Sequence, residues 1–470
     1  MLSKVLVANR GEIAVRIIRE CMDASLDTVA VYSKGEEDAL HTLMAGEAVC
    51  IGGPRPADSY LNMDNIISAA VNTGCDAVHP GFGFLSENSD FARACRENDL
   101  KFIGPAPDVI DGMGNKSAAR DMMKKAGVPV VPGSDGPVSS PEEAADISDS
   151  IGYPVLVKAS AGGGGRGMRR ADDREEVIRA YSEASAEAES CFGNGELYVE
   201  KLVEDPRHIE FQILADSRGN VIHLGERNCS IQRRNQKMIE EAPAFGLSSR
   251  LRDEMGSAAV RAAEAAGYEN AGTIEFIMDE DNNYYFIEMN TRLQVEHPVT
   301  EMVTGVNIVK EQLRIASGLP LSLEQVDVRI SGHALECRIA AEDIYRDFAP
   351  CPGRIDFVHL PAGNGVRVDS AVYNGCEISP YYDSMIAKVI TTGGTRLEAV
   401  RRMRRALEET AIEGVSTTLP VQDLIMYSRD FLRGTYNTGY MEKHLQEILD
   451  IYEAAGGRNE STGSHCFVAA

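Results

Sequence analysis

The sequence predicts an α/β protein, α+β overall, that begins with a Rossmann-like domain and ends in a β-rich region. Two observations support this fold class. Over residues 4–103, short apolar strands alternate with amphipathic helices, which is typical of a parallel sheet covered by helices. After Gly332, short strands follow one another before an Arg-rich amphipathic helix at 396–411. The 470 residues exceed what one core usually supports, so we expect about three domains.

The first domain opens with a short strand and an amphipathic helix joined by a turn. We expect its strands at 4–8, 28–32, 48–51, 75–79 and 101–103, and its helices at 12–22, 60–72 and 88–97. The first turn contains Gly11 but no GxGxxG pattern, so a dinucleotide is not indicated. The segment from His79 to Ser86 is either a binding loop or an ordinary Gly/Pro turn.

Composition excludes several classes of function. The formal net charge of -25 argues against general binding to nucleic acid or to anionic membranes, because both require positive potential. No apolar run is long enough to span a membrane, and the amino terminus lacks a signal peptide, so we expect a cytoplasmic protein. The ten cysteines are scattered without a zinc or CxxC motif. Any anionic substrate therefore requires a local cluster of Lys and Arg.

A glycine-rich loop follows a buried strand in the middle of the chain. Helix 116–125 ends at a Gly/Pro segment, 127–133, which is a plausible domain boundary, and strand 153–158 comes next. Four consecutive glycines in the loop 159–167 allow backbone amides to approach an anion closely. Basic residues flank the loop at Lys158, Arg166, Arg169 and Arg170. The segment indicates a phosphate site, and a flexible linker is the alternative.

Polar and basic patterns mark the next part of the chain. The strand 197–203 could pair its backbone with an adenine edge, and 208–214 alternates cleanly between polar and apolar residues. The segment 232–237 is a basic island that is either an oxyanion site or a solvated charge run. Helices are expected at 172–190, 250–266 and 305–317.

A polar face is predicted on a hairpin formed by 273–278 and 284–298. In the second strand, every second residue from Glu288 to Glu296 is charged or an amide, so these side chains share one side of an extended chain. If Met278 pairs with Tyr285, Glu275 faces Glu288, and with Asn290 they suggest a hard cation, Mg²⁺ or Mn²⁺. The alternative is a solvent-facing strand with hydrated charges.

Five segments resemble the biotin carboxylase family: ANRGEIA at 8–14, HPGFGFLSEN at 79–88, KASAGGGGRGM at 158–168, EMNTRLQVEHPVTE at 288–301 and PYYDSMIAK at 380–388. They run through nearly the whole chain in the order of the family. The resemblance implies a Rossmann-like N-terminal domain at 1–114 and an ATP-grasp domain at 115–330 with a mobile lid at about 131–203. A C-terminal biotin carboxylase domain at 331–446 and a polar tail at 447–470 follow.

The resemblance also implies roles for individual residues. ATP would be bound by Lys116, Lys158, Gly164, Gly165, Glu200, Lys201, Leu202, Val203, His208, Asn235, Glu275 and Glu288. Glu275, Glu288 and Asn290 would hold Mg²⁺ or Mn²⁺, with two ions expected. Bicarbonate and biotin would lie among Lys237, Arg292, Gln294, Val295 and Arg338. The catalytic residues would be Lys237, Arg292, Glu296 and Arg338, with Glu296 as the general base and Arg338 stabilising the biotin enolate.

One departure and one missing motif qualify this assignment. The best-known members carry His where this chain has Asn235, and Asn cannot become cationic, which bears on the nucleotide contact at this position. The sequence contains no Ala-Met-Lys-Met biotin-attachment motif, so biotin is expected on a separate carrier protein, with carboxyltransferase subunits as further partners. A homodimer is implied by the family.

The resemblance implies a biotin carboxylase subunit of acetyl-CoA carboxylase, and a subunit of a pyruvate or other acyl-CoA carboxylase is the alternative. A different ATP-grasp ligase is disfavoured by the presence of Arg338 and by the full row from Glu288 to Glu296. A non-catalytic nucleotide-binding assembly subunit would be expected to lack at least one of Glu275, Glu288, Arg292, Glu296 or Arg338, and all five are present.

Overall fold

The computed structural model describes residues 2–159, 168–192 and 195–457. Gly164, Gly165 and most of the predicted polar tail lie outside these residues. The chain divides into two compact units: residues 1–114, 207–275 and 289–470 form the first, and residues 115–206 and 276–288 form the second. No described helix is long and apolar enough to cross a membrane.

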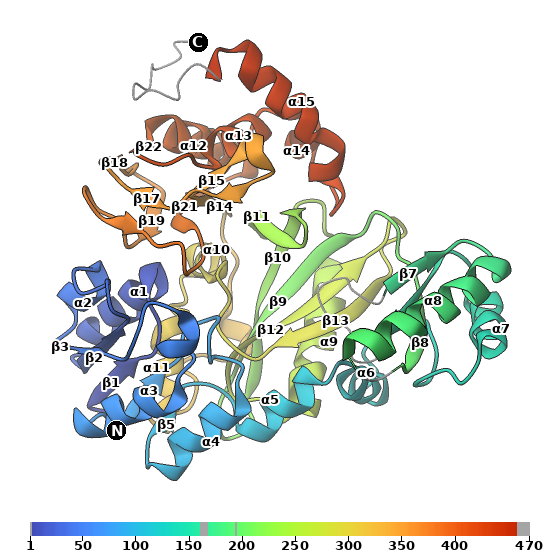
Figure 1. The fold of residues 1–470 in the computed structure, drawn as a ribbon, viewed down its shortest axis with the longest axis horizontal. Coiled ribbons are helices and arrows are strands. Elements are labelled where there is room, and N and C mark those ends of the chain that lie inside the picture. The colour runs from blue at the N-terminus through green and yellow to red at the C-terminus, as the bar shows by residue number, and fades with distance from the viewer. Residues whose placement is uncertain (1, 160–167, 193–194, 458–470) are drawn as a thin grey trace. The chain divides into compact units, whose positions relative to one another are not determined.

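The chain begins with a five-stranded parallel sheet in the order β3-β2-β1-β4-β5, which confirms the predicted Rossmann-like domain (Figure 1). Its strands are β1 (Lys4–Val7), β2 (Asp27–Tyr32), β3 (Glu47–Cys50), β4 (Ala77–His79) and β5 (Lys101–Phe102). Its helices are α1 (Gly11–Asp23), α2 (Leu40–Met44), α3 (Met63–Asn72), α4 (Ser89–Glu97) and α5 (Pro107–Gly114). The strand order reverses beside β1, where β1 and β4 are neighbours, so the loops after these two strands open at the position where α/β sheets commonly bind ligands.

An eight-stranded sheet follows in the order β13-β12-β9-β10-β11-β14-β21-β19. Its strands are β9 (Arg207–Ala215), β10 (Val221–Arg233), β11 (Gln236–Ala242), β12 (Asn270–Met278), β13 (Tyr284–Asn290), β14 (His333–Ala340), β19 (Val366–Ser370) and β21 (Met385–Gly393). The strands of the C-terminal region thus extend the same sheet as β9 to β11. The boundary between the two units runs through β12 and β13.

Helices and short strands complete the first unit. The helices are α9 (Ser249–Ala265), α10 (His297–Thr304), α11 (Ile308–Ala316), α12 (Arg396–Glu409), α13 (Leu419–Ile425), α14 (Arg429–Arg433) and α15 (Tyr440–Ala454). The short paired strands are β15 (Glu342–Asp343) with β16 (Ala349–Pro350), β17 (Gly353–Arg354) with β20 (Glu377–Ile378), and β18 (Phe357–His359) with β22 (Ala411–Glu413). Met403 and Leu407 of α12 are completely buried in the core that this region builds around β14 and β21.

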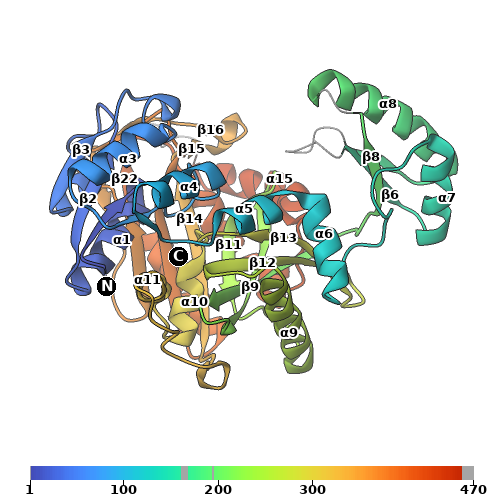
Figure 2. The same cartoon turned by 90° about the horizontal axis from the view of Figure 1, so that it is seen from below.

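The second unit is built around a three-stranded antiparallel sheet in the order β7-β6-β8. Its elements are α6 (Lys116–Lys125), α7 (Pro141–Ile151), β6 (Val155–Ala159), β7 (Met168–Ala171), α8 (Arg174–Phe192) and β8 (Leu197–Lys201). Figure 2 shows α7 and α8 on one side of β6 and β8. Val155 and Val157 point into the core beneath these helices, whereas Leu156 and Lys158 are only half-buried, as the alternation of a strand requires.

The predicted hairpin is confirmed, but its second strand is shorter than the sequence suggests. Strand β13 ends at Asn290, and residues 291–296 have no regular secondary structure before α10 begins at His297. The prediction that Glu288 to Glu296 share one face of a strand is therefore wrong beyond Asn290. Pro298 lies in the first turn of α10, where its fixed φ suits a helix, which agrees with the start of this helix at His297.

A substitution at Phe91 can test how tightly the core of the N-terminal domain is packed. Its side chain is completely buried, and its ring meets the Phe102 ring edge-on at a centroid distance of 6.1 Å. Phe91→Ala should lower the free energy of unfolding by about 3–5 kcal/mol in a urea titration, because it removes apolar contacts and leaves a cavity. Met22→Ala, at a side chain that is 56% exposed, should change it by less than about 0.5 kcal/mol. Equal losses for the two variants would contradict this packing.

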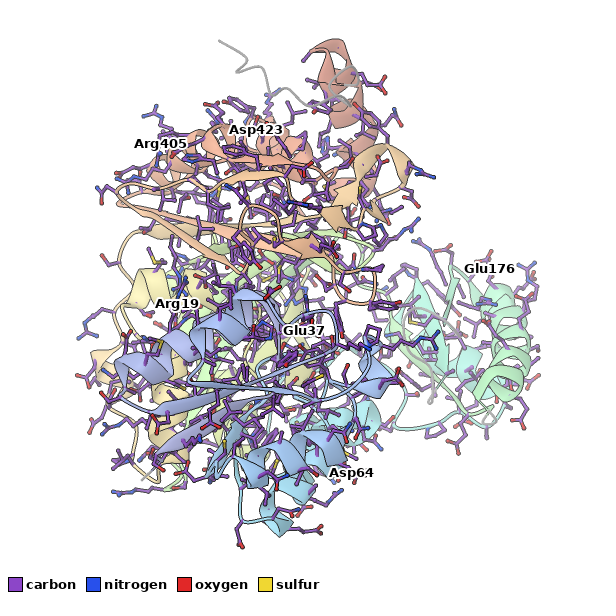
Figure 3. All side chains as sticks on the ribbon, turned by 60° about the vertical axis from the view of Figure 1, so that its left-hand side comes forward. Arg19, Glu37, Asp64, Glu176, Arg405 and Asp423 are labelled. Atoms are coloured by element: carbon purple, nitrogen blue, oxygen red, sulfur yellow. The ribbon has the colours of Figure 1, made fainter. Side chains whose placement is uncertain are left out.

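Asp423, which is labelled in Figure 3, lies on α13, and we expect its carboxyl group to make the stability depend on pH. Burial raises the pKa of its carboxyl group to about 6, Glu408 adds to the rise and Arg404 opposes it. The folded state therefore holds this proton more tightly than the unfolded chain, and the stability it provides is lost as pH rises from about 4 to about 6.

Asp423→Asn cannot ionise, so at about pH 8 it should be more stable than the parent by about 1–2 kcal/mol, with no difference near pH 3.5. Thermal unfolding at several pH values measures this. Asp64→Asn, at an exposed position of α3 (Figure 3), is the matched control for loss of one carboxylate. A gain for Asp423→Asn that is the same at both pH values would show that ionisation is not its cause.

Candidate active site

Lys237 on β11 lies at the centre of a cluster of buried carboxylates. Its Nζ lies 2.5 Å from Glu210 Oε2, 2.9 Å from Glu275 Oε1 and 2.6 Å from Glu296 Oε1. Glu210 comes from β9, Glu275 from β12, and Glu296 from the irregular segment before α10. The side chain of Lys237 is only 12% exposed, so one ammonium group is enclosed by three acids from separate parts of the chain.

These charges fix one another's protonation. Burial alone would lower the pKa of Lys237, but Glu210, Glu275 and Glu296 outweigh it and hold that pKa well above its usual value. Burial would likewise raise the pKa of Glu296, but Lys237 and Arg338 bring it well below its ordinary range. At neutral pH, Lys237 is therefore a cation and Glu296 an anion.

Arg338 on β14 holds the other oxygen of Glu296. Its Nη2 donates to Glu296 Oε2 at 2.9 Å and lies 2.6 Å from Glu240 Oε1. Burial raises the pKa of Glu240 to about 7, although Arg338 opposes the rise. Glu296 is thus fixed between an ammonium and a guanidinium group, with no exposure to solvent.

The side chains of the irregular segment form a chain of hydrogen bonds. Arg292 donates from Nη2 to Asn290 Oδ1 at 3.0 Å, from Nη1 to Gln294 Oε1 at 2.8 Å and from Nε to Glu87 Oε2 at 3.0 Å. Asn290 Nδ2 and Gln294 Nε2 both donate to Glu275 Oε1, at 2.8 and 2.9 Å. Asn290, Arg292 and Gln294 are therefore in contact, but through the turning of the backbone and not through the predicted alternation of a strand.

Of the other predicted residues in the first unit, His208 and Val295 have contacts in or beside this cluster, whereas Asn235 is exposed to solvent. His208 Nε2 is 2.8 Å from Glu275 Oε2, and the backbone oxygen of Val295 accepts a hydrogen bond from Lys388 Nζ at 2.8 Å. Asn235 is exposed in the turn between β10 and β11, with φ of 64°. In the basic segment 232–237, Arg233 and Arg234 both pair with Asp347, so only its last residue, Lys237, enters the cluster.

The predicted nucleotide residues of the second unit form two ion pairs. Lys158 Nζ lies 2.5 Å from Glu200 Oε2, and Lys116 Nζ lies 3.4 Å from Glu288 Oε2. The predicted adenine segment follows directly, with Lys201 at the end of β8 and Leu202 N donating to Pro154 O at 2.9 Å. Val203 comes next and is partly buried.

Sequence reasoning missed three fully buried members of the cluster: Glu210, Arg227 and Glu240. Arg227 Nε donates to Glu210 Oε1 at 2.5 Å, and its Nη1 and Nη2 donate to Gln212, Thr300 and Thr273. A signal for Glu210 was present, because polar residues alternate at 208, 210 and 212 in a strand whose other residues are apolar. Arg227 and Glu240 lie in long strands where no such pattern distinguishes them.

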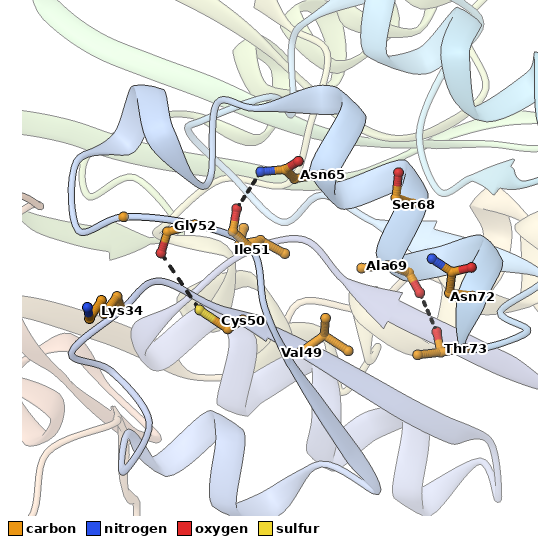
Figure 4. Close-up of a pocket in the computed structure, with 11 residues that line it drawn as sticks. Lys34, Val49, Cys50, Ile51, Gly52, Asn65, Ser68, Ala69, Asn72 and Thr73 are labelled. Atoms are coloured by element: carbon orange, nitrogen blue, oxygen red, sulfur yellow. Dashed lines mark hydrogen bonds between the residues drawn. The ribbon is translucent and has the colours of Figure 1, made fainter.

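A separate pocket of about 600 Å³ lies beside β3 and α3 (Figure 4). Lys34, Cys50, Gly52, Asn65 and Asn72 are among the residues that line it. None of the predicted site residues belongs to this pocket, so it is distinct from the Lys237 cluster.

Three family models together match most of the chain. They are described as "Biotin carboxylase, N-terminal domain" at residues 1–110, "Carbamoyl-phosphate synthase L chain, ATP binding domain" at 115–324, and "Biotin carboxylase C-terminal domain" at 336–443.

Individual proteins agree with these matches. Biotin carboxylase 1 of Bacillus subtilis is 56% identical over 445 residues, covering 94% of this chain and 99% of that protein. A pyruvate carboxylase subunit of Methanothermobacter thermautotrophicus is 54% identical over 448 residues, covering 95% of this chain and 91% of that protein.

A crystal structure of the biotin carboxylase domain dimer of Hydrogenobacter thermophilus 2-oxoglutarate carboxylase, with MgADP, ADP and bicarbonate, matches with a TM-score of 0.88 and 54% identity. It covers 95% of this chain and 99% of that one. Since the matched domains and the identity both extend over nearly the whole sequence, the chain belongs to the biotin carboxylase family of ATP-grasp ligases.

Proposed function

We propose that the chain carboxylates biotin on a carrier protein, using ATP and bicarbonate and releasing ADP and phosphate. The observation that carries this proposal is the fixed position of Glu296 between Lys237 and Arg338. A buried carboxylate held by two cations is suited to a reaction in which an anion must be bound, deprotonated and kept from water. The related 2-oxoglutarate carboxylase domain, which was crystallised with MgADP and bicarbonate, supports the same choice of substrates.

Bicarbonate is assigned to Lys237, Arg292, Gln294, the backbone of Val295 and Arg338. In the structure, the ammonium group of Lys237 already forms ion pairs with three carboxylates. A bicarbonate ion that binds Lys237 competes with Glu296 for this cation, which weakens the interaction that depresses the pKa of Glu296. Glu296 then becomes a stronger base at the moment when a proton must be removed from bicarbonate.

In the first step, a bicarbonate oxygen attacks the γ-phosphorus of ATP while Glu296 takes the bicarbonate proton. The new oxygen–phosphorus bond forms as the bond to the β-phosphate bridging oxygen breaks, which gives carboxyphosphate and ADP. Lys116 and Lys158 are assigned to neutralise charge on the transferred group, and the backbone N–H groups of Gly164 and Gly165 and the side chain of His208 are assigned as further contacts to the phosphates. Glu200, Lys201, Leu202, Val203 and Asn235 are assigned to the rest of the nucleotide.

Mg²⁺ or Mn²⁺ is assigned to Glu275, Glu288 and Asn290. Two carboxylates and an amide oxygen are hard oxygen donors of the kind these ions prefer, and Glu275 and Asn290 are already in hydrogen-bond contact in the first unit. When bound, the metal would neutralise phosphate charge and polarise the γ-phosphoryl group. Glu275 Oε1 accepts hydrogen bonds from Lys237, Asn290 and Gln294, and its Oε2 lies 2.8 Å from His208 Nε2, so these partners must rearrange to admit an ion.

In the second step, carboxyphosphate breaks down to CO₂ and phosphate beside biotin. The phosphate removes the proton from the ureido nitrogen, and the nitrogen then attacks CO₂ to form carboxybiotin. Arg338 is assigned to stabilise the negative oxygen of the deprotonated ureido group, because its guanidinium group remains charged throughout. Arg292 orients the reacting groups through the side chains it already holds.

The final acceptor that we favour is acetyl-CoA, in a complex with a biotin carboxyl carrier protein and carboxyltransferase subunits. Related subunits of a pyruvate carboxylase and of a 2-oxoglutarate carboxylase, each 54% identical, make a 2-oxo acid the second candidate.

We also propose a homodimer, supported by the dimeric 2-oxoglutarate carboxylase domain. We propose three domains, at residues 1–114, 115–330 with a lid at about 131–203, and 331–446. The boundary between the two compact units after residue 114 supports the end of the first domain.

The reaction predicts that ADP formation depends on bicarbonate and increases with biotin. Purified protein with ATP, Mg²⁺ and bicarbonate should release ADP slowly, and adding free biotin or a biotinylated carrier protein should raise the rate several-fold. ADP is measured with a coupled enzyme assay. The controls omit bicarbonate or replace biotin with an analogue that lacks the ureido nitrogens. Turnover that is indifferent to biotin would favour another ATP-grasp ligase, and no turnover would favour a nucleotide-binding assembly subunit.

Arg338→Ala should separate carboxylation from nucleotide binding. The change removes the cation assigned to the biotin oxygen, so biotin-dependent carboxylation should fall about 10²-fold or more, whereas the dissociation constant of ATP should change by less than about threefold. Carboxybiotin formation from ¹⁴C-bicarbonate and ATP binding by calorimetry measure the two effects.

Arg252→Ala is the matched control, because Arg252 is similarly exposed, at 23% against 19% for Arg338, and pairs with Glu226 outside the cluster. It should leave both quantities close to wild type. Equal losses of ATP binding and carboxylation in Arg338→Ala would contradict the assigned role.

A further inference from the structure

Lys388 is a fully buried lysine of β21 that none of the steps above uses. Its side chain has no solvent exposure, and in the sheet it stands directly opposite Arg338 on β14 and Asp369 on β19. Directly opposite residues of antiparallel strands point to the same face, so Lys388 and Arg338 extend side by side from the sheet. One of these two adjacent cations holds the side chain of Glu296, which raises the question of what the other holds.

The ammonium group of Lys388 contacts the residue next to Glu296. Its Nζ donates to the backbone oxygen of Val295 at 2.8 Å and lies 3.1 Å from Glu12 Oε1 on α1. Asp369 Oδ2 is more distant, at 3.9 Å, and the Phe82 ring centroid lies 5.9 Å away. Lys388 therefore connects the C-terminal sheet, the first helix and the segment that carries the proposed base.

The charge on Lys388 is retained inside the protein. Burial alone would lower the pKa of Lys388, but Glu12 and Glu336 outweigh it and raise that pKa above its usual value. The hydrogen bond to Val295 is therefore charge-assisted, and such bonds are about twice as strong as those between neutral groups. A cation at this depth costs desolvation energy, which Glu12 offsets.

The segment 291–296 needs an external support of this kind. It has no regular secondary structure, so no strand ladder or helix fixes its backbone. Arg338 and Lys237 hold the side chain of Glu296, and a hydrogen bond from His297 N to Gln294 O at 3.3 Å closes the turn around it, but this bond does not engage the carbonyl group of the Val295–Glu296 peptide. A hydrogen bond to the carbonyl group of Val295 fixes that peptide and, through it, the direction in which the Glu296 carboxylate points.

We propose that Lys388 is a positioning residue for the carboxylation reaction, which holds the Val295–Glu296 backbone so that Glu296 meets bicarbonate in a productive orientation. This inference rests on the proposed function. Lys388 acts through Val295, and Glu12 serves to keep the buried ammonium group charged. Misplacing a catalytic group by about 1 Å can reduce a rate about 10²-fold, so the effect belongs in kcat and not in the affinity for ATP.

The test uses the full-length chain and three variants: Lys388→Met, Glu12→Gln/Lys388→Met and Glu12→Gln. The double variant removes both charges and so leaves no unpaired carboxylate at position 12. Steady-state ADP release is measured against ATP, bicarbonate and free biotin, together with thermal unfolding. Both Lys388 variants should lose about tenfold or more in kcat, with KM for ATP within about twofold of wild type. Glu12→Gln alone should lower the unfolding temperature but keep kcat within about threefold, because Lys388 still donates to Val295 and Asp369 remains beside its ammonium group.

A second buried ion pair provides the matched control. Arg396 Nε lies 2.6 Å from Glu241 Oε2, and both side chains are at least nine-tenths buried. Arg396 also donates to the backbone oxygens of Phe431 and Leu432, and Glu241 accepts from Tyr436, so these contacts lie outside segment 291–296. Arg396→Met/Glu241→Gln should lose stability to a similar degree and keep its kcat.

The inference is overturned if the folded Lys388 variants keep wild-type kcat, if the Arg396 control loses as much kcat as they do, or if Glu12→Gln alone reproduces their kinetic loss. In that last case Lys388 would serve the buried charge pair and not the Val295 peptide. If the wild-type chain itself fails to release ADP in response to biotin, the proposed function fails, and the role proposed for Lys388 fails with it.

Discussion

The active site depends on one ammonium group that compensates three buried carboxylates. Lys237 contacts Glu210, Glu275 and Glu296 within 2.9 Å, and Arg227 and Arg338 supply further positive charge. Buried charges of one sign would be strongly unfavourable, and this arrangement persists because each acid has a cation within hydrogen-bond distance. The cluster therefore constrains the fold. It is also sensitive to ligands, since an anion that binds Lys237 would change the pKa of all three carboxyl groups.

The sheet order explains how this cluster is assembled. Strands β12, β9, β10 and β11 are successive neighbours, so Glu275, Glu210, Arg227 and Lys237 approach one another although up to 65 positions separate them in the sequence. Glu296 and Gln294 come from outside this ladder, in a segment where the backbone turns. An irregular segment suits a catalytic role, because it can direct successive side chains at one point, which a strand cannot do. Its freedom must then be limited by contacts such as those of Arg292, Arg338 and Lys388.

Much of the fold could be predicted because its signals are local. The alternation of strands and helices in residues 4–103 and the hairpin turn at 279–283 each follow from neighbouring residues. The resemblance of whole segments to a family also singled out Glu275, Asn290, Gln294 and Lys237 as site residues, and in the structure Asn290, Gln294 and Lys237 all contact Glu275.

Other features depend on distant parts of the chain and could not be read in this way. The end of β13 at Asn290 could not be predicted, because the alternation of polar residues continues to Glu296. Arg227 and Glu240 resemble ordinary strand residues until the neighbouring strands are known. The extension of the large sheet by β14, β21 and β19 likewise depends on pairing over long separations.

The most direct test of the central claim follows the oxygen atoms of bicarbonate. With ¹⁸O-labelled bicarbonate in unlabelled water, and with measurement fast enough to precede exchange, attack on the γ-phosphorus should place one bicarbonate oxygen in each phosphate released, as seen by mass spectrometry. In Lys237→Gln, this transfer should fall in parallel with biotin carboxylation, because the cation to which we assign bicarbonate is lost. Phosphate that takes its new oxygen from water in the wild-type reaction would contradict the account, since water and not bicarbonate would then be the nucleophile that the cluster serves.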